Sequence, residues 1–287
     1  SGRHDAAKIL RPFIQSLLER RSPQKAAVLL HDADSPNKVA QTLLEMVRGG
    51  MADVPVGLTA FYQGDPFEAS FVASLPMRVH ALTGGEPSFR QAVRDGAFDY
   101  VILFESSGMY RGEDIVALAS HLASGRLDAV WGSRRLSLRD IEESTRLRYH
   151  KAPLAGAISS VGSHLLSLAC LLLYDRYVSD TLSAVRAIRT EDALGVGVPL
   201  THKRANQHLL ARLLRRKAEF LEIPVQFLPI SPERVKRTSV VEGLQSLGAL
   251  FAGRFRTPRP RRVDPVQVAT PGTAGSEDRR ADPVTSR

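Results

Sequence analysis

The sequence predicts an α/β protein in which a mostly parallel sheet is covered by helices on both faces. Two observations support this fold class. Short apolar runs recur along the chain, and the segments between them carry apolar residues at the spacing of a helix face. Strands that alternate with helices are typical of parallel sheets, because each helix carries the chain back across one face. The 287 residues, of which 43% are hydrophobic, are enough for one sizeable core.

The first strand and helix are separated by clear turn residues. Residues 26–30 read Ala-Ala-Val-Leu-Leu, a short apolar strand, and the sequence Asp-Ser-Pro-Asn at 34–37 interrupts it. A helix is expected over 39–47, where apolar residues return at helical spacing. The next expected elements are strands over 55–61 and 77–82 and a helix over 88–95.

The run from Tyr100 to Phe104 is apolar throughout, as in a strand buried on both faces. A helix opens at 111–118, and a second strand, 127–135, ends in hydroxyl and guanidinium groups. Residues 154–174 are the most apolar stretch but contain serines, a glycine and a histidine, so we expect a buried or surface-lying helix. The last expected strand covers 220–227.

Composition divides the chain into three parts. Residues 1–24 are expected to form a leading amphipathic helix, 25–254 the main domain, and 255–287 a disordered tail rich in Pro and Arg. The start of the chain lacks the apolar region of a signal peptide, so a cytoplasmic protein is expected, with peripheral membrane association left open. Cys170 is the only cysteine, which excludes an internal disulfide, and its apolar neighbours indicate a core position.

The formal net charge of +9 would suit phosphorylated ligands, an anionic membrane surface or nucleic acid. No nucleic-acid recognition motif accompanies the charge, and aromatic residues are few, so we expect no nucleic-acid partner. The sequence also lacks the glycine-rich nucleotide loop, the zinc-protease helix and the nucleophile elbow that mark several common enzyme classes.

Glu105, Ser106 and Ser107 follow the strand 100–104, and open α/β sheets place their ligand sites at such carboxyl ends. This stretch resembles the family 2 glycosyltransferases, especially the dolichyl- and polyprenyl-phosphate sugar synthases. In that family a strand, a D-x-D motif, a helix and a strand ending in G-S-R come in this order. The resemblance implies a GT-A-like, Rossmann-like fold and a nucleotide diphosphate sugar as donor.

The family's carboxylate positions are depleted in this chain. Its first strand usually ends in P-x-Y-N-E, its second in paired aspartates and its fourth in D-x-D. The corresponding residues here are 31–35, about 60–63 and 105–107, which read His-Asp-Ala-Asp-Ser, Ala-Phe-Tyr-Gln and Glu-Ser-Ser. The resemblance implies Mg²⁺ or Mn²⁺ as cofactor, but such ions need anionic oxygen ligands, and Glu105 is the one metal ligand we can name. The donor is then held with a weak metal site or none.

The resemblance assigns donor binding to five residues. Glu105 would accept a hydrogen bond from a ribose or sugar hydroxyl, or it is a solvated acid at a strand end. Asp32 and Asp34 would contact the base or ribose, or else residues 34–37 cap the following helix. Ser107 and Arg134 complete the expected donor set.

The most specific local match is residues 178–189, which resemble the family's acceptor motif i-x-D-x-x-S-G-f-R-a-x-R with Ala184 in place of the glycine. Asp180 would be the general base that takes the proton of the attacking acceptor. If the acceptor is a phosphate, Asp180 would instead orient the acceptor or a metal, and a third alternative is that it caps a helix. Ser183 and Arg186 are the expected acceptor or phosphate ligands.

A basic loop follows the expected last strand. Arg234, Lys236 and Arg237 stand where the family places cationic residues beside phosphate. They would bind the donor diphosphate or the phosphate of a lipid acceptor, or they form a solvated basic loop.

Two functions follow from these observations. The first is a glycosyltransferase that moves a hexose from a nucleotide diphosphate sugar to a polyprenyl phosphate or similar phosphorylated acceptor, with inversion. The alternative is a non-catalytic glycosyltransferase-like domain with a binding or regulatory role. The three depleted carboxylate positions keep the alternative open.

Overall fold

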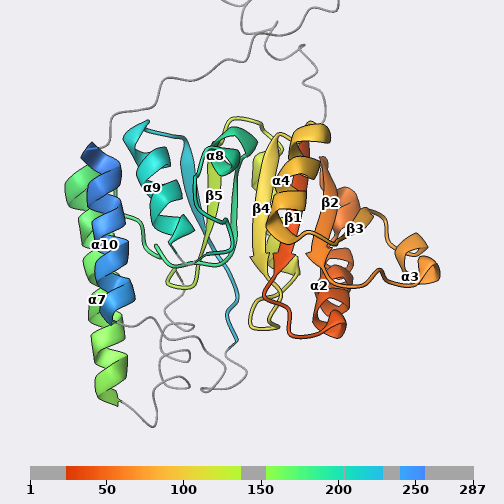
Figure 1. Cartoon of the computed structure of the whole chain (residues 1–287), viewed down its shortest axis with the longest axis horizontal. Coiled ribbons are helices and arrows are strands. Elements are labelled where there is room, and N and C mark those ends of the chain that lie inside the picture. Colours follow the sequence, from red (N-terminus) through yellow and green to blue (C-terminus); the bar gives the residue numbers. More distant parts are fainter. Residues whose placement is uncertain (1–23, 137–152, 203, 229–239, 256–287) are drawn as a thin grey trace, which may run out of the picture. The chain divides into compact units, whose positions relative to one another are not determined.

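A seven-stranded mixed sheet forms the centre of the described part of the chain (Figure 1). The computed structural model describes residues 24–136, 153–202, 204–228 and 240–255. The strand order is β3-β2-β1-β4-β6-β5-β7, and every neighbouring pair is parallel except those of β6, which runs antiparallel to both β4 and β5. The strands are β1 Gln24–His31, β2 Val56–Gln63, β3 Arg78–Leu82, β4 Tyr100–Glu105, β5 Ala129–Ser133, β6 Arg186–Arg189 and β7 Phe220–Pro224.

Helices cover both faces of this sheet. One face packs against α2 and α5, and the opposite face packs against α4, α7, α8, α9 and α10. The described helices are α2 Pro36–Arg48, η1 Met51–Asp53, α3 Ala69–Ala73, α4 Gly85–Asp95, α5 Glu113–Leu122, α7 Pro153–Tyr174, α8 Thr190–Leu194, α9 Ala205–Arg215 and α10 Val240–Phe255. The expected α/β fold with a mostly parallel sheet and helices on both faces is therefore confirmed.

Strand alternation divides the core into two layers. In β1, Ala26, Val28 and Leu30 pack toward α2 and α5, while Ala27 and Leu29 pack toward α4 and α9. All five are buried, which explains why this strand reads as a continuous apolar run. Burial of apolar side chains on both faces stabilises the central strands.

The element β6 was not expected as a strand. It has only four residues, Arg-Ala-Ile-Arg, and charged groups at both ends give it no apolar pattern of its own. Residues 178–185 are followed by the strand β6 and not by a helix. The alternative that Asp180 caps a helix is therefore wrong.

Cys170 lies in the core, as expected, and burial raises the pKa of its thiol to about 12. Within the residues described here, no helix is long and apolar enough to cross a bilayer. The expected leading helix over 1–24 falls outside the described residues apart from Gln24, which belongs to β1, and the tail 255–287 does so apart from Phe255.

Candidate functional site

The carboxyl ends of β1 and β4 meet at the topological switch point of the sheet. From β1 the chain moves to β2 and β3 on one side, whereas β4 lies on the other side of β1. His31 and Glu105, the last residues of the two strands, are direct register partners. Ligands of open α/β sheets bind outside the strand ends at such a point, so this edge is the candidate site.

The ring of His31 lies at this edge without a hydrogen bond. Its side chain is 10% exposed, and neither buried ring nitrogen makes a hydrogen bond; Nδ1 lies 3.4 Å from Oδ2 of Asp32. Buried polar groups without a hydrogen-bond partner cost free energy, which a water, an ion or a ligand can recover by supplying the missing bond. No role was predicted for His31 from the sequence.

Asp32 adds backbone strain at the same point. Its φ is 55°, in the left-handed region that a residue with a side chain rarely adopts. Strained backbone of this kind is concentrated at ligand sites, because the surrounding structure has to hold it in place. The exposed Asp34 follows, so both predicted acids stand on the loop between β1 and α2.

The expected capping of α2 is absent at its N-cap residue. Ser35 occupies that position with extended backbone, but its side chain makes no capping hydrogen bond. The first N–H groups of a helix are left free by the helix itself and favour an anion. The amino end of α2 therefore faces the switch point without the Ser35 hydroxyl as its cap.

At the end of β4, three residues behave differently. Glu105 is half-buried, and Ser106 is fully buried with a hydroxyl that has no hydrogen-bond partner, although its N–H donates to the His31 carbonyl at 2.8 Å. Ser107 turns its hydroxyl toward its own loop, where it accepts from the N–H of Met109 at 3.4 Å. Ser106, for which no role was predicted from the sequence, is thus the serine whose hydroxyl lacks a hydrogen-bond partner.

Arg134 and Asp180 form a bidentate ion pair at the same edge. Because β6 is antiparallel, its amino end lies beside the carboxyl ends of β4 and β5, and this brings Asp180 next to the residue that follows β5. Nε of Arg134 donates to Oδ2 of Asp180 at 2.6 Å and Nη2 to Oδ1 at 2.7 Å. The backbone N–H of Arg134 adds a third bond at 3.1 Å.

Burial and charge act in opposite directions on this pair. Asp180 is 3% exposed, and burial alone would raise its pKa, but the charge and hydrogen bonds of Arg134 outweigh burial and hold the pKa below its usual value. The same carboxylate raises the pKa of Arg134. A carboxylate with both oxygens occupied and a lowered pKa is a poor proton acceptor, so the geometry suits Asp180 better to orienting Arg134 than to general-base catalysis.

Glu222 on β7 holds the turn that carries Asp180. Its carboxylate accepts from the N–H of Ser179 at 2.9 Å and from the Ser179 hydroxyl at 2.7 Å. The indole N–H of Trp131 donates to the Asp180 carbonyl at 2.9 Å. No role was predicted for Glu222 from the sequence, because it is the pairing of β5 with β7 that brings its side chain to the Asp180 turn.

Arg135 is a second guanidinium at this edge. It donates to the Ser179 carbonyl at 3.3 Å and to the Ser163 hydroxyl at 3.2 Å, and it contacts the His164 ring. Through these bonds the end of β5 is tied to α7. Arg135 is one of the guanidinium groups expected at the end of the strand 127–135, but its position beside the Asp180 turn was not expected.

The two predicted acceptor ligands are buried. Ser183 exchanges hydrogen bonds with the backbone of Val185, at 3.1 and 3.2 Å. Arg186 is 3% exposed, donates to the carbonyls of Ser183 and Leu200, and has its guanidinium carbon 5.7 Å from the centre of the Trp131 ring. Burial lowers its pKa to about 10. As placed, both side chains support the 178–186 segment from within, and an acceptor role for them stays a prediction.

The remaining predicted ligands, Arg234, Lys236 and Arg237, lie outside the described residues. The described carboxylates also do not assemble a metal site, since the described part of the chain contains no group of three His, Cys, Asp or Glu side chains that could hold an ion. Glu105 with Ser106 and Ser107 is not the donor set that Mg²⁺ or Mn²⁺ prefers. We therefore derive no chemical step through a metal.

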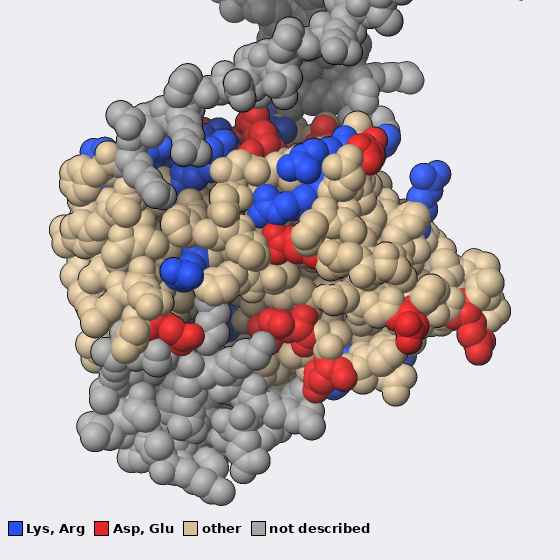
Figure 2. Space-filling model, viewed as in Figure 1, with Lys and Arg blue, Asp and Glu red and all other residues tan. Residues whose placement is uncertain are grey.

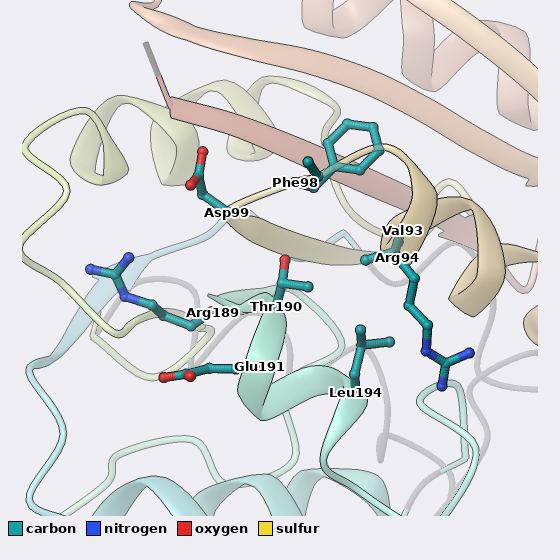
Figure 3. Close-up of a pocket in the computed structure, with 9 residues that line it drawn as sticks. Val93, Arg94, Phe98, Asp99, Arg189, Thr190, Glu191 and Leu194 are labelled. Atoms are coloured by element: carbon teal, nitrogen blue, oxygen red, sulfur yellow. The ribbon is translucent and has the colours of Figure 1, made fainter. Parts of the chain in front are cut away.

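A surface pocket of about 590 Å³ lies at the opposite edge of the sheet (Figure 3). It is lined by Phe98 and Asp99 before β4, by Arg189 at the end of β6 and by Thr190 and Glu191 of α8. This is the amino edge of the parallel strands. None of the predicted site residues lines it, so the pocket does not coincide with the candidate site.

Comparisons with known proteins give a structural similarity only. No family model matches the sequence, and no curated protein matches it. Among solved structures, the chain is similar to glucosyl-3-phosphoglycerate synthase from Mycobacterium tuberculosis in complex with UDP, with 15% identity, a TM-score of 0.47 and coverage of 81% of this chain and 80% of that one. A complex of the same enzyme with Mn²⁺, UDP and phosphoglyceric acid gives 12% identity, a TM-score of 0.48 and coverage of 83% and 80%. Because both TM-scores lie below 0.5, we base no functional argument on them.

Proposed function

We propose that this protein is a glycosyltransferase that moves a hexose from a nucleotide diphosphate sugar to a phosphorylated acceptor, with inversion. The observation that carries the proposal is the convergence of three features at the carboxyl edge of the sheet: Glu105, the His31 ring, whose nitrogens make no hydrogen bond, and the Arg134–Asp180 pair. The motif resemblance of residues 178–189 supports the same assignment. A polyprenyl phosphate is the acceptor that this resemblance favours.

The donor would lie across the ends of β1 and β4. Glu105 would accept a hydrogen bond from a ribose or sugar hydroxyl. The donor would also supply hydrogen bonds to the His31 ring and the Ser106 hydroxyl, which make none in the described structure. The amino end of α2 would face the negative charge of the diphosphate. Asp32 and Asp34 would border the nucleoside from the loop between β1 and α2.

The departing diphosphate would be stabilised by cations rather than by a strongly held metal. Arg134 and Arg135 are two guanidinium groups at this edge, and arginine matches phosphate oxygens with two parallel hydrogen bonds. Fixed charges placed where negative charge develops lower the barrier, because they need no reorganisation during the reaction. Arg234, Lys236 and Arg237 would add to them.

In the reaction, an acceptor oxygen would attack the anomeric carbon in line with the bond that breaks. The new bond forms as the bond from that carbon to the diphosphate oxygen is cleaved, and the nucleoside diphosphate leaves with the electron pair. A phosphate acceptor is already ionised and needs little proton removal. The lowered pKa of Asp180 is therefore compatible with transfer, with Asp180 orienting Arg134 and the acceptor.

A second candidate is a non-catalytic domain that binds a nucleotide sugar or a phosphorylated ligand without transfer. Two observations favour it: both oxygens of Asp180 are occupied, and the described residues contain no metal cluster. The two candidates share the donor site and differ in turnover.

Calorimetric titration tests the donor site. The purified protein is titrated with UDP, GDP and their hexose conjugates, each with and without Mg²⁺ or Mn²⁺. Saturable binding of one nucleotide sugar supports both candidates, and release of the nucleoside diphosphate on adding a short-chain polyprenyl phosphate supports the enzyme. If a nucleotide sugar binds but no phosphorylated acceptor of a panel causes release of the nucleoside diphosphate, the second candidate is favoured. If the folded protein binds none of these nucleotides, both candidates are contradicted.

A further inference from the structure

The guanidinium of Arg134 is held on one edge and on one face. The edge formed by Nε and Nη2 is bonded to Asp180, at 2.6 and 2.7 Å. The ring of Phe227 covers one face, with the guanidinium carbon 5.4 Å from the ring centre. A cation over an aromatic face is attracted by the negative charge density of the ring. The carboxylate fixes how the guanidinium is turned within its plane, and the ring fixes the tilt of that plane.

Phe227 is itself held by a chain of aromatic rings that begins in the core. Its ring meets the ring of Tyr110 edge to face, with 5.1 Å between the ring centres, and Tyr110 meets Phe104 of β4 in the same way at 6.2 Å. All three residues are buried. Such edge-to-face pairs are favourable beyond the burial of their area. The ring beside Arg134 therefore has a fixed orientation relative to β4.

The backbone around Phe227 is tied to neighbouring elements as well. Phe227 forms an antiparallel β-bridge with Tyr110. Two residues before it, the N–H of Val225 donates to the carbonyl of Ser133, the last residue of β5, at 3.0 Å. The chain after β7 thus runs from the end of β5 to the loop after β4, and this path carries Phe227 over Arg134.

A second edge of the Arg134 guanidinium stays available. Nη1 donates to none of the residues that the structure describes, and the bond from Nη2 to Asp180 uses one of the two protons on that nitrogen. The Nη1 and Nη2 edge presents two parallel N–H groups, which match two oxygens of a phosphate. Where this edge points depends on how the plane of the guanidinium is held.

Acidic side chains stand at the same edge of the sheet. Figure 2 shows such side chains along the lower margin of the view, where β1 and β4 end in the same view of Figure 1. Asp32 and Asp34 are exposed, and the charge of Glu105 contributes to the raised pKa of Arg134. These carboxylates repel an approaching oxyanion, so its stabilisation depends on N–H groups that point at it. The orientation of Arg134 then matters in addition to its charge.

We propose that Phe227 is a positioning residue for sugar transfer, and that its ring holds Arg134 so that the Nη1 and Nη2 edge faces the departing diphosphate. This inference rests on the proposed function. Phe227 acts through Arg134 and touches no reacting atom. A cation that is fixed before the reaction stabilises the developing charge without reorganisation. A weaker hold by the ring should therefore slow transfer and leave the affinity for the donor nearly unchanged.

Fluorinated phenylalanines in place of Phe227, in the full chain, test the proposal. Fluorine withdraws electron density from the ring face and changes the shape of the ring little, so the contact with Arg134 weakens in steps from one to three fluorines. We expect the rate of nucleoside diphosphate release to fall in the same steps, by about twofold to thirtyfold in total. Donor affinity, measured by calorimetry, should stay within about threefold of the wild type.

Phe220, at the other end of β7, is the matched control. Its ring also lies 5.4 Å from a guanidinium carbon, that of Arg176, and it is 5% exposed compared with 6% for Phe227. Phe220 begins β7 and so lies at the opposite edge of the sheet from the candidate site. The same fluorinated residues in place of Phe220 should leave the rate of transfer unchanged. Thermal unfolding checks that each protein is folded.

Two results would overturn the positioning role. One is a transfer rate that does not change with the number of fluorines on Phe227, and the other is an equal fall in the Phe220 series, which would indicate a general effect on the fold. The wild type distinguishes these results from failure of the proposed function. If the wild type releases no nucleoside diphosphate with any acceptor, the proposed transfer is contradicted and the role of Phe227 with it. If the wild type turns over and the Phe227 series keeps its rate, only the positioning role is contradicted.

Discussion

The guanidinium of Arg134 donates hydrogen bonds to both carboxylate oxygens of Asp180, at 2.6 and 2.7 Å. The two residues are 46 positions apart and meet because β6 runs against its neighbours, so the pair exists only in the folded sheet. It lies where a donor diphosphate and an acceptor would approach each other. In the proposed function, the pair would set both the stability of this edge and the orientation of a cation beside the donor.

Asp180→Asn should abolish transfer while leaving donor affinity within about threefold of the wild type, because Arg134 keeps its charge but loses its fixed orientation. Breaking a buried pair by neutralising one partner should also lower the free energy of unfolding by about 2–4 kcal/mol. Turnover and donor titration on the same preparation measure the first effect, and denaturant unfolding measures the second. Unaltered product formation would show that Asp180 has no part in transfer.

The stability difference between wild type and Asp180→Asn should depend on pH. The folded pKa of Asp180 lies below its usual value of 3.8, so the folded state favours the ionised form. The contribution is then complete above about pH 5 and is lost as pH falls below the usual pKa toward the folded one. Unfolding free energies from pH 7 to pH 3 should converge for the two proteins, and a constant difference would contradict the assignment.

Glu222→Gln should loosen the turn that carries Asp180. The carboxylate accepts from both the N–H and the hydroxyl of Ser179, and an amide can replace only part of this. We expect a loss of about 1–3 kcal/mol in unfolding free energy together with a fall in transfer. Glu219→Gln is the matched control, because Glu219 is an exposed acid just before the same strand. Equal losses in the two variants would remove any special role of Glu222.

Apolar runs were sufficient to predict the central strands and the fold class. Tyr100 to Phe104 is buried on both faces, and the sequence shows this directly as an uninterrupted apolar run. The short β6 could not be predicted in this way, since its two end residues are arginines whose charges are accommodated by backbone carbonyls and, for Arg189, by Asp128. Local pattern carries no information about such distant partners.

The candidate site was predicted by position better than by role. The strand-end location of Glu105 is a local property and followed from the apolar run before it. The pairing of Asp180 with Arg134, the support from Glu222 and the missing hydrogen bonds of the His31 ring and the Ser106 hydroxyl all depend on how strands far apart in sequence pack together. The resemblance named Asp180 and Arg134 separately, but only folding joins them.

Glu105→Ala should weaken binding of the nucleotide sugar about tenfold or more, because a hydroxyl of the donor would lose a charged acceptor. Stability should change little, since Glu105 is half-buried at a strand end. Titration of the variant with the donor that the wild type binds measures the effect, with Glu219→Ala as the control at an exposed acid that precedes β7, at the opposite edge of the sheet. Unchanged affinity would leave Glu105 as a solvated acid.

Gly112→Ala should disturb the contact between α2 and α5. A Cβ at this position would lie 2.3 Å from the carbonyl oxygen of Thr42 and 2.9 Å from Cβ of Glu45. Backbone on α2 would have to move, and the 2.7 Å hydrogen bond from the Gly112 N–H to Glu45 would be strained with it. We expect a loss of about 1–3 kcal/mol in unfolding free energy, measured with denaturant. Gly197→Ala, where a Cβ meets nothing within 4 Å, is the control.

Asp114 at the start of α5 offers a pH-dependent test of the core below the site. Burial raises its pKa to about 7, with a further contribution from Glu113 and Glu45, and its Oδ2 makes no hydrogen bond. A raised folded pKa means that ionisation opposes folding, so this residue lowers stability progressively as pH rises from about 4 to 7.

Asp114→Asn removes that ionisation. Relative to the wild type, the variant should therefore gain about 2–3 kcal/mol in unfolding free energy between pH 5 and pH 8, even if the amide packs less well at both values. Denaturant unfolding of both proteins at the two pH values measures how much the difference between their unfolding free energies changes with pH. Asp95→Asn, at an exposed acid of α4 that accepts a hydrogen bond from Gln91, should show no comparable change. If the wild type and Asp114→Asn changed in parallel with pH, Asp114 would have to be ionised in the folded protein throughout this range.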